Sequence, residues 1–268
     1  MNLQGKPTGE TLRPSHPANI LSTFQDGTRT WPNETLVTIA LEDGTPPYTL
    51  PKADLTTASP YFEAALNARS SSNQDGTLRL GGAGDMPACE RKTFDLFLYW
   101  LYHKAFPNPL QPPQPTETLE ETYTTMVLLW HFADQYLIPK LQKAAMRSIL
   151  ALGTQKSLPV DKLSPAVTQL IFRLTAAESP LRRWAVRVWD YQISVLGSGG
   201  YPEWDRGCLN ELGRIRDFWY EYSKAQCEQQ RDPEIWKEHE EPSARREWGW
   251  FGVGREEREG ESKGEAWK

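Results

Sequence analysis

Strand-forming patterns in this sequence are confined to residues 35–80, and that restriction does most to limit the possible folds. The clearest pattern is Thr35–Leu41, where large apolar residues alternate with small or polar ones, as on a half-buried strand. Tyr48–Leu50 and Thr77–Leu80 are further short candidates. A sheet of about three short strands is not stable alone and must be covered by helices. The sequence therefore predicts an α+β fold, a small sheet covered by helices.

Helical periodicity after these strands supplies the expected cover. The predicted helices of this part lie at Tyr61–Asn67, Phe94–Tyr102, Leu119–Asp134 and onward from about Pro139. Ser59 is a typical N-cap residue, and Pro60 is suited to the first helical position, so the first of these helices has a defined start.

The rest of the chain carries only helical patterns. Helices are predicted at Pro165–Ala177, Pro180–Leu196 and Cys208–Gln226. The expected organisation is a flexible lead-in at 1–33, an α+β domain at 34–152, an all-helical region at 153–228 and a charged, disordered tail at 229–268. The tail also contains Trp236, Trp248, Trp250 and Trp267, which we interpret as anchors that fold on binding.

Composition excludes several classes of function. The net charge is -5 and the sequence pI is about 5.5, which argues against binding of nucleic acid through bulk electrostatics. The three cysteines show neither disulfide nor metal spacing, which favours a reducing compartment. No signal peptide and no apolar run long enough for a membrane span is evident. We expect a soluble intracellular protein of the cytoplasm or nucleus.

Motifs for catalysis or cofactor binding are weak. Gly81–Gly84 follows a strand but lacks the spacing of a phosphate-binding loop. His131 and Asp134 have no second pair at ligand spacing, so a structural histidine is favoured over a metal site. Cys89 precedes a helix but has no identifiable base nearby in sequence. The sequence predicts a protein that is not an enzyme and has no cofactor, metal or small-molecule substrate.

The order of the elements resembles a known family. The stretches Lys52–Phe62, Phe94–Tyr102, Leu129–Asp134 and Leu137–Leu141 follow one another as in the BTB/POZ domain, in particular the BTB proteins of filamentous fungi. The resemblance covers about Leu36 to Leu152. It implies a BTB/POZ-like fold for the α+β domain, with the all-helical region following it.

The resemblance also implies function. The first hypothesis is a non-enzymatic adaptor or scaffold that binds other proteins, including a second copy of itself. The second is a substrate adaptor that binds a cullin scaffold in a ubiquitin ligase. It ranks lower because Leu66–Asn73 lacks the acidic residue that cullin-binding members carry in this loop. The third is a transcriptional regulator, although neither zinc-finger spacing nor a basic helix is present. Membranes and nucleic acid are not expected partners.

Five residues are the candidates for protein binding. Tyr61, Phe62 and Leu66 lie on the helix opened by Ser59, with Tyr61 expected at the surface. Trp189 and Tyr220 fall off the apolar stripes of their helices, whereas Trp184 and Trp219 fall on them and are expected in the core. Aromatic residues dominate the energetics of protein interfaces, which is why off-stripe aromatics are favoured as contact residues.

Overall fold

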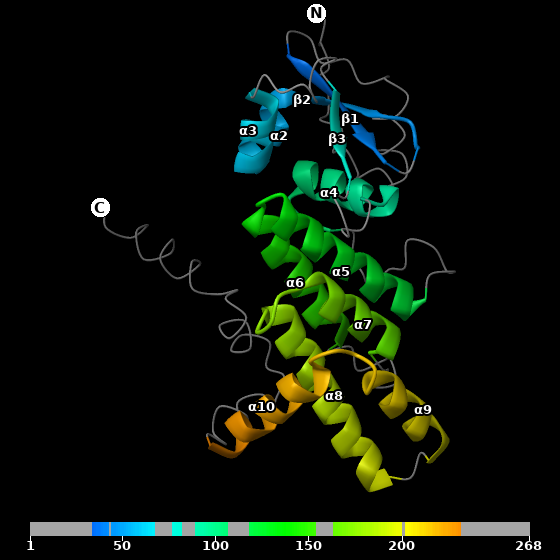
Figure 1. Cartoon of the computed structure of the whole chain (residues 1–268). Coiled ribbons are helices and arrows are strands. Elements are labelled where there is room, and N and C mark those ends of the chain that lie inside the picture. Colours follow the sequence, from blue (N-terminus) through cyan, green and yellow to red (C-terminus); the bar gives the residue numbers. More distant parts are fainter. Residues whose placement is uncertain are drawn as a thin grey trace, which may run out of the picture.

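The structure is a computed structural model that describes residues 34–42, 44–67, 77–81, 89–106, 118–153, 163–199 and 202–231. Figure 1 shows a small sheet at one end, with helices extending away from it to the other end. Helices dominate the described residues, and the strands form one three-stranded mixed sheet, so the expected α+β class is confirmed. The predicted lead-in at 1–33 and the tail beyond Arg231 lie outside the described residues.

The sheet has the order β2-β1-β3. β1 (Leu36–Leu41) pairs antiparallel with β2 (Tyr48–Pro51) and parallel with β3 (Thr77–Leu80). A parallel pair needs a long crossover, which here contains α2 (Lys52–Ala58) and α3 (Pro60–Asn67). The buried side chains alternate along β1, as its sequence pattern predicted.

One aromatic layer joins the sheet to the helices below it. α4 (Arg91–His103) buries its apolar stripe, and Phe94 and Phe97 contact Phe132 of α5 with ring centroids 6.2 and 5.2 Å apart. On the sheet side, Tyr48 contacts Phe94 at 4.8 Å. These rings cover the apolar face that a small sheet cannot bury by itself.

α5 (Leu119–Gln135) is the central helix of the molecule. A capping box at Thr118 starts it: the Thr118 hydroxyl accepts from the Glu121 N–H, and Glu121 accepts from the Thr118 N–H. α5 packs against α4 and α6 (Pro139–Gly153) and also against α7 (Pro165–Leu174). The helical region therefore packs on the α+β part, and the buried apolar residues of both form one cluster.

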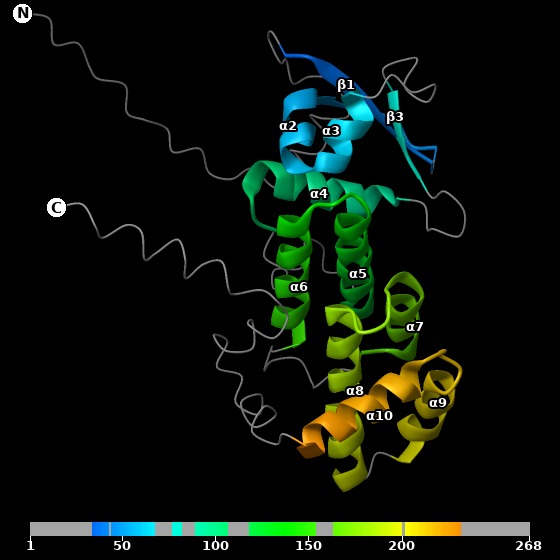
Figure 2. The same ribbon diagram turned by 60° about the vertical axis from the view of Figure 1, so that its left-hand side comes forward.

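The C-terminal helices pack around α8 (Pro180–Gly199). Figure 2 shows α10 (Phe218–Arg231) crossing α8, and the two helices are in contact. α9 (Pro202–Leu212) packs against α7. α8 therefore contacts both α7 and α10, and this packing buries Trp184 and Trp189.

The single helix expected over Cys208–Gln226 is wrong. The structure has two helices there, because α9 ends at Leu212 and α10 begins at Phe218. Directly after α9, the N–H groups of Arg214 and Ile215 donate to the carbonyl oxygens of Glu211 and Leu212, a tight turn that ends the helix. Asp217, with φ 68°, then redirects the chain into α10. The apolar steps of three and four residues across this break belong to different helices.

Candidate functional site

The candidate residues of α3 are divided between core and surface. Tyr61 is 37% exposed, as expected, whereas Phe62 is fully buried and Leu66 is half-buried. Phe62 stacks on Tyr136 at the end of α5, with ring centroids 5.5 Å apart and an interplanar angle of 17°. Of these three candidates, Tyr61 alone has an exposed side chain, and Phe62 holds α3 in place. Phe62 has no exposed surface in the described structure, so partner contact through this residue stays a prediction.

Ser59 fixes the orientation of α3. Its hydroxyl accepts from the N–H groups of Tyr61 and Phe62, at 3.0 and 3.3 Å, which makes it the predicted N-cap. The same hydroxyl donates to the carbonyl oxygen of Tyr136 at 2.5 Å and is buried. One side chain thus connects the start of α3 to the end of α5.

The turn between α5 and α6 presents Leu137 to solvent. The Ile138 N–H donates to Ala133 O at 2.7 Å and the Leu137 N–H donates to Asp134 O at 3.2 Å, the two bonds of a Schellman motif. This motif needs a left-handed residue after the cap, usually glycine. Here it is Leu137, with φ 53°, and its side chain is 54% exposed.

Tyr61 and Leu137 flank Tyr136 and form the surface that we name the α3 corner. The rings of Tyr61 and Tyr136 meet edge to face at 5.1 Å, and Leu137 follows Tyr136 directly in sequence. Burial raises the pKa of the Tyr136 hydroxyl above its ordinary value, with further contributions from Cys89 and Tyr61. The corner thus presents two large side chains, Tyr61 and Leu137, above a buried phenol, which suits the binding of another protein.

The candidates of the helical region are distributed differently from the prediction. Tyr220 is 73% exposed, as expected, but Trp189 is 1% exposed, so its predicted surface position is wrong. Trp189 lies outside the apolar stripe of α8, but α7 covers that side of the helix. Its Nε1 donates to Thr168 Oγ1 of α7 at 2.7 Å. Trp184 is buried, as expected. Trp219, expected in the core, is 39% exposed because the break before α10 changes the phase of its helix.

A buried ion pair holds α10 against α8. Arg182 Nη1 donates to Glu221 Oε1 at 3.0 Å, and both side chains are largely buried. The remaining guanidinium donors bond to Thr175 Oγ1, Thr175 O and Phe172 O at the end of α7. Nothing in the local sequence around Arg182 indicates this network, since its carboxylate partner lies 39 residues away. The network positions Tyr220, next to Glu221, at the surface.

Within the described residues, no group of three or more histidine, cysteine or acidic residues is placed to hold a metal ion. His131 is buried, and neither of its ring nitrogens has a hydrogen-bond partner in the described part of the chain. Burial lowers the pKa of His131, although Asp134 opposes this shift. Burial therefore disfavours the charged form of the His131 imidazole.

No protein-family model matches the sequence, and no curated protein matches it. Among the described helices, none is long and apolar enough to cross a membrane.

Proposed function

We propose that this chain is an intracellular, non-enzymatic protein-interaction module with a BTB/POZ-like domain, acting as an adaptor or scaffold. The order of its elements supports the proposal: a strand pair, a helix opened by Ser59, a short strand, an amphipathic helix and a final helix pair. These follow the sequence stretches that resemble the family. The α3 corner is the binding surface.

The observation that carries this proposal is the conformation of Leu137. A leucine in the left-handed region costs about 1–2 kcal/mol relative to the right-handed region. Its side chain is also mostly exposed, so burial does not offset that cost. The Schellman motif accounts for the left-handed backbone at this position but not for a leucine there, and strained non-glycine residues cluster at functional sites. A large apolar side chain exposed directly after Tyr136, whose ring contacts Tyr61, is what a protein-docking surface requires.

The proposal is tested by affinity purification of the full chain in three forms. These are the unaltered chain, the double variant Tyr61→Ala/Leu137→Gly, and the control variant Tyr191→Ala/Tyr220→Ala. The control removes two exposed aromatic side chains from α8 and α10. We expect some proteins to be retained by the unaltered chain and the control but lost from the α3-corner variant. Equal retention by all three forms would contradict the α3 corner as a binding surface.

Two additions separate the alternatives. Light scattering on the same three samples detects self-association, which the corner variant reduces if the partner is a second copy. Direct binding of a purified cullin scaffold tests the ubiquitin-ligase hypothesis. That hypothesis and the transcriptional one rest on the family resemblance alone, since no contact among the described residues favours either.

A further inference from the structure

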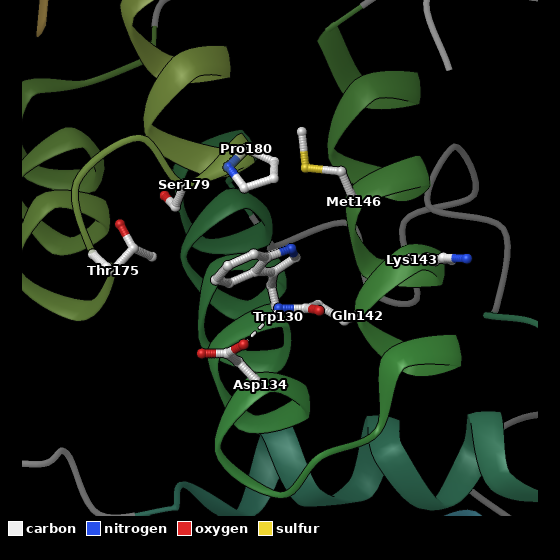
Figure 3. Close-up of a pocket in the computed structure, with 9 residues that line it drawn as sticks. Trp130, Asp134, Gln142, Lys143, Met146, Thr175, Ser179 and Pro180 are labelled. Carbon is white, nitrogen blue, oxygen red and sulfur yellow. Dashed lines mark hydrogen bonds between the residues drawn. The ribbon is translucent and has the colours of Figure 1, made fainter. Parts of the chain in front are cut away.

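A groove lies where α5 and α6 meet the turn between α7 and α8 (Figure 3). Its volume is about 260 Å³. Pockets for drug-sized ligands and cofactors span about 300–1,000 Å³, so this groove fits one large side chain better than a cofactor. The residues that the following argument uses are Trp130, Asp134, Gln142, Met146, Ala176 and Pro180.

The groove combines apolar walls with one oriented carboxylate. Trp130 and Asp134 are one helical turn apart on α5 and therefore lie on the same face. Gln142 Nε2 donates to Asp134 Oδ1 at 3.0 Å, which orients the carboxylate. Figure 3 shows Trp130 at the centre, with Pro180 and Met146 on one side of it and Asp134 on the other. Such a site fits an aromatic side chain next to a cationic one.

Lys143 also lines the groove. Figure 3 shows the Lys143 ammonium group directed away from Trp130 and the Asp134 carboxylate next to Trp130. A cationic side chain is therefore the complementary ligand for this part of the groove.

The chain itself contains a segment of the matching chemistry. Beyond the described residues, the sequence includes Arg246-Glu-Trp248, followed by Trp250. In an extended segment, residues two apart lie on the same side. Arg246 and Trp248 would then be separated by about 6.6 Å. Trp130 and Asp134, four residues apart on a helix, are separated by about 6 Å along its axis. The two spacings match.

The tether is long enough to reach the groove. The Arg182–Glu221 and Lys224–Glu178 ion pairs place α10 beside the turn between α7 and α8, whose residues line the groove. From the end of α10 at Arg231, a fully extended chain to Arg246 spans up to about 50 Å. A short tether gives an effective concentration of about 1 mM. A segment with a dissociation constant of about 0.1 mM would therefore occupy the groove most of the time.

We propose that the groove binds the Arg246–Trp248 segment of this same chain. The indole of Trp248 lies between Met146 and Pro180, and the guanidinium of Arg246 pairs with Asp134. The C-terminal segment is thus an intramolecular ligand for the groove between the two parts of the molecule. This inference is independent of the α3 corner and of the family resemblance.

The test uses the full-length chain and a fluorescein-labelled peptide of residues 245–253, with binding measured by fluorescence anisotropy. The full-length variant Trp248→Ala has lost its own ligand, so we expect it to bind the peptide about tenfold more tightly than the unaltered chain. Equal affinity for both proteins, or binding to neither, would overturn the intramolecular assignment.

Two matched substitutions locate the bound peptide. In the Trp248→Ala background, Ala176→Trp fills the groove and is expected to abolish binding, whereas Ala177→Trp is the control. Both alanines are exposed in the same turn, but Ala176 lines the groove and Ala177 does not line it. If Ala176→Trp and Ala177→Trp bind the peptide equally well, the peptide binds elsewhere and the proposal is wrong.

A charge exchange tests the pairing of Asp134 with Arg246. Asp134→Arg, again in the Trp248→Ala background, is expected to weaken peptide binding at least tenfold. A peptide carrying Arg246→Glu should recover most of that loss on the Asp134→Arg protein alone. Absence of this recovery, with both proteins folded by circular dichroism, would remove the proposed ion pair.

Discussion

The α+β part, from β1 to α6, and the helical part, from α7 to α10, are stabilised by different kinds of core. The α+β part has a layer of packed aromatic rings at the junction of sheet and helices. The helical part contains a buried ion pair between Arg182 and Glu221 and a buried tryptophan hydrogen bond. Apolar cores tolerate substitution that keeps volume, whereas a buried charge depends on its partner. The two parts should therefore respond differently to single changes.

The largest expected effect is in the helical part. Glu221→Ala leaves the Arg182 charge buried without a carboxylate, and we expect it to lower the free energy of unfolding by about 3–5 kcal/mol. Urea denaturation followed by circular dichroism measures it. The control is Lys224→Ala, which breaks the exposed pair with Glu178 and should leave the midpoint nearly unchanged. If both variants shift the urea midpoint equally, the buried Arg182–Glu221 pair stabilises the protein no more than the exposed pair does.

Two helix caps, one in each part of the molecule, should also differ in their contribution to stability. Ser59 caps α3 and also donates to the buried carbonyl of Tyr136, while Ser164 caps α7 and donates to exposed Glu120. We expect Ser59→Ala to lower the free energy of unfolding by about 2–3 kcal/mol, because the helix loses its cap and the buried Tyr136 carbonyl loses this hydrogen-bond donor. Ser164→Ala should cost about 1 kcal/mol. Equal losses in urea denaturation would mean that the Ser59–Tyr136 bond contributes little.

The pH dependence of stability reports on the buried His131. Burial lowers its pKa in the folded protein below the ordinary value of 6.5. As the pH falls through that value, the unfolded chain binds a proton that the folded chain does not, so stability decreases. The slope from His131 is at most about 1.4 kcal/mol per pH unit. His131→Leu should flatten the profile of unfolding free energy between pH 7 and 5, and an unchanged slope would assign the dependence to other groups.

The smallest expected effect is a gain in stability. Leu137→Gly removes the side chain that makes the left-handed conformation costly, and we expect it to raise the free energy of unfolding by about 0.5–1 kcal/mol. Thermal denaturation measures this change. If the α3 corner binds a partner, the same variant is more stable yet binds less. A loss of stability would instead show that the Leu137 side chain contributes to the fold.

The local signals of the α+β part made its elements predictable. Ser59-Pro60, the alternation along β1 and the stripe of Phe94–Tyr102 each act within a few residues, and the structure confirms all three. The exposure of Tyr61 was also predicted, from its place at the start of the helix that Ser59 opens. Leu137 was not recognised, because the turn after α5 carries no glycine to mark its left-handed residue. Pro139, two residues later, was the available sign that a helix ends nearby.

Most helices and strands could be located from local patterns alone, since periodicity and capping are properties of neighbouring residues. The faces of α8 and α10 that are buried depend instead on how the helices pack together. Arg182 and Trp189 lie inside because partners from α7 and α10 satisfy their polar atoms. Burial of a charge or an indole N–H is favourable only when a hydrogen-bonding partner is present, and those partners are distant in sequence. A pattern read along one helix contains no information about them.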